Sequence, residues 1–388
     1  ALFFIGYASW QDKLEVFGNP GAVRAVDGVT YETALGESGE VNLPSKLNLP
    51  PSTPVVLSAE LAAGPRESLL VKSAFAPMRV YLNGDLVFEC GQEGSYPSFM
   101  NDPPTILSII PLPDEGGIYA LQVEYISPSQ RSFLSLPGMY IGEETGLIAR
   151  QLHFDGFSFL FSVLLLFIGI IMTIVSISLA LRLSSGLNLF WLGLFSLLAG
   201  IWGLGECDLT AFLLHRPSLL YAMSYIGLFT MTIPFLQFSL IMLRPANRLT
   251  LRICLWVHYL SVAVVLTLQL CGFVDFSKSL YWFHIVTPLM FIVFTIFLLL
   301  EHYRYRNTAA KRFGLAILLP AIGLLLEFAN YWLHFTETIT LFFQLGLAAF
   351  VVVFGVASGF YIRQSIYAAA EKKRLEYEVA AVNHQLEL

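Results

Sequence analysis

Seven long apolar stretches constrain this chain more than any other feature of its sequence. Each has about 20 mostly apolar residues, the length that an α-helix needs to cross the hydrocarbon core of a bilayer. They cover residues 157–181, 187–205, 218–243, 249–271, 279–300, 313–333 and 338–362. Only 13% of the 388 residues are charged, where a soluble domain has about a quarter. The sequence therefore predicts a bundle of seven transmembrane helices.

The polar residues are concentrated in front of this bundle. Residues 1–150 contain 8 Lys/Arg, 17 Asp/Glu and 14 of the 19 prolines, whereas residues 151–388 contain 14 Lys/Arg and 11 Asp/Glu. An acidic front domain excludes nucleic acid as a partner, because binding phosphates needs a basic face. We expect a lead-in at 1–19, an extracytoplasmic domain at 20–150, a membrane domain at 151–363 and a cytoplasmic helix at 364–388. The apolar residues Ala1–Ile5 fit either a cleaved signal or an uncleaved anchor.

The basic residues between the spans predict the orientation of the chain. The loops and the tail on one side of the predicted membrane contain 12 Lys/Arg, and the loops on the other side contain only Arg216 and Lys278. Cytoplasmic loops carry the excess of basic residues in membrane proteins. We therefore expect a multi-pass protein of the bacterial plasma membrane, with residues 1–150 outside and the C-terminus in the cytoplasm.

The front domain has the pattern of an antiparallel β-sandwich. Short apolar runs alternate with Pro, Gly, Asn and Asp. The clearest element is the segment 78–88, in which two strand-like runs flank Asn83-Gly84. Asn-Gly is the strongest signal for a two-residue hairpin, because both positions of a type I′ turn need a positive φ. Further strands are predicted at 55–61, 68–74, 105–110, 118–126 and 138–141.

Several polar residues fall at membrane depth. Glu327, Asn330, Tyr331 and His334 follow the spacing of one helix face. Glu206, His284 and Gln344 fall in the same outer half of the predicted bundle, as do Asp208 and Gln269. An ionisable residue inside a span is costly, so it faces the bundle interior or a wet cavity. Two interpretations stay open: a ligand-binding outer pocket, and hydrogen bonds that only hold the helices together.

The sequence contains no motif typical of an enzyme active site. It contains no phosphate loop and no nucleotide-binding signature, and we predict no catalytic residue, cofactor or metal site. A retinal protein is excluded because residues 338–362 contain no lysine. The four cysteines lack metal-ligand spacing. Cys207 and Cys271 both fall near the outer surface, where a disulfide and simple apolar packing are the alternatives.

The C-terminal segment predicts a dimerising helix. Residues 364–388 contain no Gly or Pro and are rich in helix formers. An apolar seam with heptad spacing follows Leu375, Val379, Val382 and Leu386. As a continuation of the seventh span, this segment predicts a parallel homodimer. The alternative is a solvated tail, which usually lacks such a seam.

The front domain resembles the galactose-binding-like jelly roll of carbohydrate-binding modules. The resemblance rests on the run 80–87 and on the segments 110–113 and 119–123. It implies a fold rather than a sugar ligand. Tyr96, Phe99 and Tyr140 fall on expected loops, where they could stack on a sugar ring or simply pack.

The order of the whole chain resembles the bacterial seven-transmembrane receptors with diverse intracellular signalling modules. The segments 190–206 and 232–236 carry that resemblance within the bundle. It implies a receptor for an unknown extracellular small molecule, carbohydrate or peptide, with a histidine kinase beyond residue 388. The run 383–388 is similar to the linker before some kinase cores, although His384 lacks the acidic residue that follows a phosphoacceptor. The alternatives are a membrane diguanylate cyclase and a transporter or solute-capture protein. Pro234, Pro288 and Pro320 interrupt three spans, but the two-fold repeat of a transporter is not evident.

Overall fold

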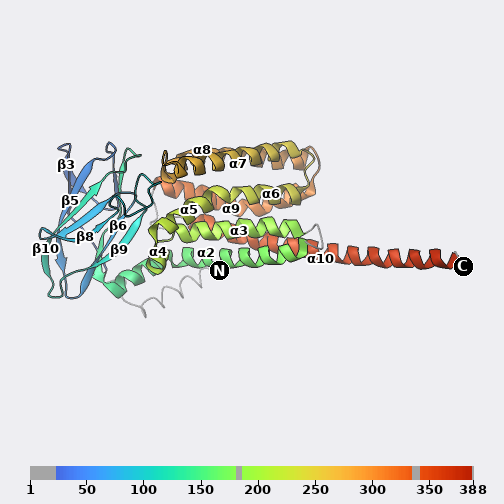
Figure 1. Cartoon of the computed structure of the whole chain (residues 1–388), viewed down its shortest axis with the longest axis horizontal. Coiled ribbons are helices and arrows are strands. Elements are labelled where there is room, and N and C mark those ends of the chain that lie inside the picture. Colours follow the sequence, from blue (N-terminus) through green and yellow to red (C-terminus); the bar gives the residue numbers. More distant parts are fainter. Residues whose placement is uncertain (1–22, 181–185, 334–340, 387–388) are drawn as a thin grey trace. The chain divides into compact units, whose positions relative to one another are not determined.

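A computed structural model describes residues 23–180, 186–333 and 341–386 (Figure 1). The first part of the described chain is built from strands. Their bounds are β1 Arg24–Ala25, β2 Val29–Thr33, β3 Ser38–Val41, β4 Ser45–Leu47, β5 Pro54–Ala63, β6 Glu67–Ser73, β7 Met78–Leu82, β8 Asp85–Cys90, β9 Ile106–Pro111, β10 Gly117–Ile126, β11 Leu134–Leu136 and β12 Tyr140–Glu143. Each segment predicted to be a strand corresponds to one of these elements.

The strands form antiparallel sheets around one apolar core. One sheet has the order β3-β2-β5-β10-β7-β8, a second has the order β1-β12-β6-β9, and β11 pairs with β4. The longest ladder joins β5 to β10, from Pro54 opposite Ile126 to Ala63 opposite Gly117. Buried residues of both larger sheets, including Val55, Val71 and Val123, belong to the same core. The predicted sandwich-like domain is therefore confirmed as antiparallel sheets that share one core.

The predicted hairpin is also confirmed. Asn83 and Gly84 join β7 to β8 with φ values of 52° and 90°. Positive values at both positions are those of a type I′ turn. The Asn83 Oδ1 atom accepts a hydrogen bond from the Ala120 N–H group at 2.8 Å, which ties the turn to β10.

Helices make up the rest of the described chain. Their bounds are α2 Glu144–Ala180, α3 Gly186–Glu206, α4 Asp208–Leu214, α5 Pro217–Thr230, α6 Thr232–Leu243, α7 Arg248–Leu270, α8 Phe276–Tyr303, α9 Thr308–Leu333 and α10 Leu341–Leu386. Seven spans in the described chain are long and apolar enough to cross a membrane, with α5 and α6 together forming one of them. The number of spans therefore agrees with the prediction, and the chain is a multi-pass membrane protein.

The three prolines within the predicted spans have different effects on their helices. The third span is interrupted at Met231, between α5 and α6, three residues before Pro234. Proline has no N–H group and clashes with the preceding turn, which explains a break at this place. Pro288 and Pro320, by contrast, lie inside the continuous helices α8 and α9. The expectation that these two prolines interrupt their spans is therefore wrong.

Two compact units divide the chain. The first comprises the residues up to Phe159 together with Leu204–Tyr225 and Ser261–Ile285. It thus contains the β-rich domain, the start of α2, α4 and the adjoining ends of α3, α5, α7 and α8. The second comprises Leu160–Gly203, Ile226–Leu260 and the residues from Val286 on. Its core is rich in aromatic rings, with Phe238, Phe313 and Phe350 completely buried.

The cysteines form no disulfide. Cys207 and Cys254 are buried, Cys90 is half-buried and Cys271 is exposed, and all four are free. Burial raises the pKa of the Cys90 thiol to about 11 and that of the Cys207 thiol to about 12. Both therefore stay protonated at neutral pH, as expected of thiols that serve as packing groups.

Candidate functional site

Several hydrogen bonds between the β-rich domain and the helices centre on Asp275. This residue immediately precedes α8 and is 1% exposed. Its carboxylate accepts hydrogen bonds from the backbone N–H groups of Asn101 at 3.1 Å and Asp102 at 3.0 Å. It also accepts from the side-chain amides of Asn101 at 3.3 Å and Gln269 at 3.1 Å. One carboxylate thus holds the loop before β9 against the helix ends.

Gln269 extends this contact to two more helices. Its side chain is 1% exposed at the end of α7. The Nε2 group donates to the Phe99 carbonyl at 2.7 Å, and the Oε1 atom accepts from the Tyr221 hydroxyl at 2.9 Å and the Phe276 N–H group at 2.6 Å. A buried network with this many hydrogen bonds holds its members in one arrangement. We call Asn101, Asp102, Gln269 and Asp275 the docking network.

A second loop of the β-rich domain reinforces the docking. The Gln130 Oε1 atom accepts from the Asp275 N–H group at 3.0 Å, and the Arg131 guanidinium donates to the Ser277 carbonyl at 2.9 Å. The guanidinium lies 4.5 Å from the centroid of the Phe75 ring. Phe75 in turn packs edge-on against Tyr221, with the ring centroids 6.3 Å apart. Polar and aromatic contacts therefore converge on the same helix ends.

An ionic cluster joins the sheet to other helices. The Lys72 ammonium of β6 donates to an Asp208 carboxylate oxygen at 2.5 Å, and the two side chains are 28% and 25% exposed. Burial by itself lowers the pKa of Lys72, but the carboxylates of Asp208, Asp155 and Glu206 outweigh it, and the pKa is raised. A raised lysine pKa means that the stabilisation is present below the ordinary pKa and is lost only above it. The pair is therefore intact at neutral pH.

Asp102 carries a negative charge close to that of Asp275. The Asp102 Oδ1 atom accepts from the Ser129 N–H group at 2.7 Å. Burial raises the pKa of Asp102; the Ser129 hydrogen bonds oppose the rise, and the Asp275 charge adds to it. The folded protein therefore binds this proton more tightly than the unfolded chain does. The contribution of Asp102 to stability consequently falls as the pH rises from the ordinary pKa of 3.8 through the raised pKa of the folded protein.

We predict that Asp102→Asn raises the unfolding temperature at neutral pH. Asparagine keeps an acceptor for Ser129 and removes the buried charge beside Asp275. The expected gain is modest, a few degrees at most for a change of about 1 kcal/mol in a chain of this size. Unfolding curves at several pH values check it, because the gain should shrink as the medium becomes acidic. A difference between variant and wild type that is the same at every pH would contradict this explanation.

The residues predicted for an outer pocket are divided between the two compact units. Glu206 and His284 belong to the first unit, and Glu206 accepts a hydrogen bond from the Ser224 hydroxyl. Glu327, Asn330 and Gln344 belong to the second unit and are buried. Gln344 donates to the Ser162 hydroxyl at 3.0 Å, which joins α10 to α2. Tyr331 lies in α9, but its side chain is outside the description, and His334 lies outside the described residues. The pocket therefore stays a prediction.

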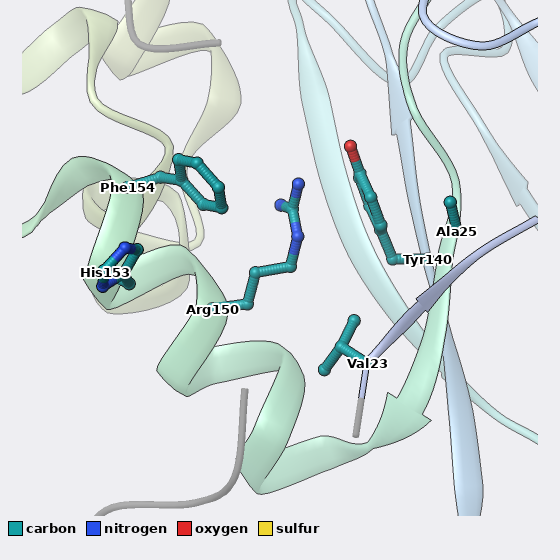
Figure 2. A pocket seen from close by; sticks show the side chains of 6 residues that line it. All are labelled: Val23, Ala25, Tyr140, Arg150, His153 and Phe154. Carbon is teal, nitrogen blue, oxygen red and sulfur yellow. The ribbon is translucent and has the colours of Figure 1, made fainter. Parts of the chain in front are cut away.

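The three aromatic residues predicted on loops have different surroundings. Tyr96 is half-buried, and its hydroxyl donates to the Asn101 carbonyl at 3.4 Å. Phe99 is 38% exposed, and its carbonyl is part of the contact with Gln269. Tyr140 is the first residue of strand β12, so its predicted place on a loop is wrong. It lines a cavity beside Arg150 (Figure 2), whose guanidinium lies 3.5 Å from the ring centroid. That ring face is therefore covered by a cation.

The predicted dimer seam lies on α10. Leu375 and Val379 are 54% and 58% exposed. The helix continues through Val382 to Leu386, whose side chains are outside the description. An exposed apolar seam is what a dimerising helix has before its partner is added, and its pairing stays a prediction.

Sequence reasoning did not identify several residues that matter in the structure. Lys72 can be noticed in the sequence, because it is a cation directly after the apolar run Leu69–Val71 of strand β6. Asp275 gives a misleading signal, because an Asp before a helix predicts an N-cap, whereas its carboxylate bonds to a distant loop. No pattern in the sequence marks Asn101 or Arg150.

Comparisons with known proteins leave the family of this chain open. No family model and no curated protein matches it. A β-glucosidase from Kluyveromyces marxianus in complex with glucose is 15% identical over 37% of this chain and 20% of that chain, with a TM-score of 0.22. The GH31 α-xylosidase from Xanthomonas citri is 12% identical over 35% and 19%, with a TM-score of 0.18. The chain spans about a fifth of the length of these enzymes, and scores this low carry no argument about fold or ligand.

Proposed function

We propose that this chain is the input and transmembrane part of a bacterial sensory receptor. Seven apolar helices are compatible with a receptor or a transporter. The observation that favours a receptor is the docking network, which ties the β-rich domain to the ends of α7 and α8 through buried hydrogen bonds. A domain fixed in this way can pass a change in its own conformation to the helices. A domain that merely captures solute needs no such attachment.

The other support comes from α10. It is one helix of 46 residues, about 69 Å long at 1.5 Å per residue. Its first part is the seventh span, Phe342–Phe360, and its last part is polar with exposed Leu375 and Val379. An uninterrupted helix carries a rotation or a shift along its whole length, which suits a receptor whose output follows the bundle. A transporter has no need of this extension.

Within this proposal the finer features follow the family resemblance. The β-rich domain is a galactose-binding-like jelly roll outside the cell, and α10 ends in the cytoplasm, as the excess of basic residues on that side suggests. The protein works as a homodimer in the plasma membrane. Its output domain is a histidine kinase beyond residue 388.

Crosslinking along α10 tests the proposal. Single cysteines at Leu375 and Val379 should form interchain disulfides at least about threefold more readily than a cysteine at Glu376, because only seam positions face the partner helix. The full chain in membranes is used, with the exposed Cys271 replaced by Ser. Equal crosslinking at the three positions would mean that the helices do not pair through this seam.

A further inference from the structure

A cavity of about 320 Å³ lies between the β1–β12 edge of the β-rich domain and the first turns of α2 (Figure 2). It is lined by Val23, Ala25, Tyr140, Arg150, His153 and Phe154. All six belong to the first unit. The volume is at the lower end of the range for small-molecule sites, about 300–1,000 Å³. A ligand of few non-hydrogen atoms would therefore fit.

The guanidinium of Arg150 is held between two aromatic rings. It lies 3.5 Å from the centroid of Tyr140 and 4.5 Å from that of Phe154, and Figure 2 shows the two rings on either side of it. Rings on both sides stabilise the cation and restrict its orientation. A guanidinium stacked between two rings binds a ligand through the N–H groups at its edge. Those groups match the two oxygens of a carboxylate or phosphate in one plane.

The other lining residues suit the rest of such a ligand. Val23 and Ala25 give the β1 side of the cavity an apolar wall, and His153 adds an imidazole from α2. Arg24 points its charge elsewhere, since it pairs with Glu67 at 2.6 Å. A polar anchor beside an apolar wall is the usual composition of a small-molecule site. Sugar stacking on Tyr140 is less suitable, because Arg150 already covers one face of the ring.

We propose that this cavity binds a small organic anion, whose carboxylate or phosphate pairs with Arg150 and whose apolar part contacts Val23 and Ala25. Binding of this anion does not require the proposed receptor function. Only the role of the anion as a signal rests on that function. Because α2 becomes apolar about 10 Å further along, at Phe157, an anionic lipid headgroup is a second source of the same chemistry.

Ligand-dependent thermal stability of the full chain in phosphatidylcholine nanodiscs tests the proposal, with benzoate and inorganic phosphate as probes. A ligand that binds only the folded state raises the unfolding temperature in a saturable way. We expect this response for wild type. Arg150→Gln should weaken the affinity at least about tenfold, because a charge-assisted pair is lost. Arg150→Lys should be intermediate, since lysine keeps the charge without the planar fork.

Two controls make the outcome decisive. Arg79→Gln removes an arginine from the exposed pair with Glu89 and should respond like wild type. His153→Gln keeps Arg150 and its two rings, and it replaces Arg150→Gln as the test variant if the latter does not fold. It should weaken the response several-fold.

A response to phosphatidylglycerol nanodiscs that Arg150→Gln abolishes would assign the anion to a lipid. If neither soluble probe nor this lipid shifts wild type, or if Arg150→Gln responds like wild type, the proposal is overturned. Signalling plays no part in this readout, so its failure is distinguishable from failure of the receptor proposal.

Discussion

Asp275→Ala should weaken the attachment of the β-rich domain to the ends of α7 and α8. The substitution removes the acceptor for the backbone N–H groups of Asn101 and Asp102 and for the side chain of Gln269. Each buried donor left without a partner costs about 1–3 kcal/mol. We therefore expect the first unit to lose about 3 kcal/mol or more of stability.

Hydrogen exchange of the full chain checks this result. The amides of Asn101 and Asp102 should exchange faster by at least about two orders of magnitude, in line with that loss of free energy. Asp275→Asn keeps one acceptor oxygen and should be intermediate. Asp114→Ala removes an exposed carboxylate of the same domain and should match wild type. Unchanged exchange in Asp275→Ala would show that the network does not hold the domain.

The second large effect is expected at the contact between α2 and α3. A Cβ atom on Gly200 would lie 2.5 Å from the Leu166 N atom and 2.8 Å from the Ser162 carbonyl oxygen. Gly169 on α2 makes the reciprocal contact, 2.4 Å from the Leu197 N atom. Small residues let membrane helices approach closely. Gly200→Val should therefore push the helices apart and cost about 3 kcal/mol or more, because backbone atoms cannot move aside as a side chain can.

Thermal unfolding in detergent, together with the yield of monodisperse protein, measures this loss. Gly314→Val is the matched control, because Gly314 lies within α9 and a Cβ atom there would meet nothing within 4 Å. It should behave like wild type. Equal losses for the two valine variants would mean that the effect comes from the helix itself and not from the contact with α2.

The features predicted correctly are those with a local cause. The length of an apolar run determines a span, and Asn83-Gly84 determines a turn, so both can be read within one segment. Helix α2 begins at Glu144, well before the predicted span, because its first turns are helical without being uniformly apolar. The short helix α4 was likewise not predicted.

The docking network could not be predicted because its members are distant in sequence. Asn101 and Asp275 are 174 residues apart, and no periodicity relates a loop of the β-rich domain to the end of a helix. The sequence marks Gln269 only as a polar residue near the outer end of a span. The structure adds the partners that explain it. The predicted pocket on α9 rested on helical spacing, which shows that Glu327 and Asn330 share a face but not what they face.

In the proposed receptor, a change in the β-rich domain reaches the far end of α10. Interchain crosslinking at Leu375→Cys, compared between the wild-type background and Asp275→Ala, tests it most directly. If docking sets the arrangement of α10, releasing the domain should change the initial crosslinking rate by at least about twofold, because seam contacts depend on helix rotation and separation. Asp114→Ala should leave the rate unchanged. Equal rates in wild type and Asp275→Ala, with hydrogen exchange showing that the domain is released, would contradict the account.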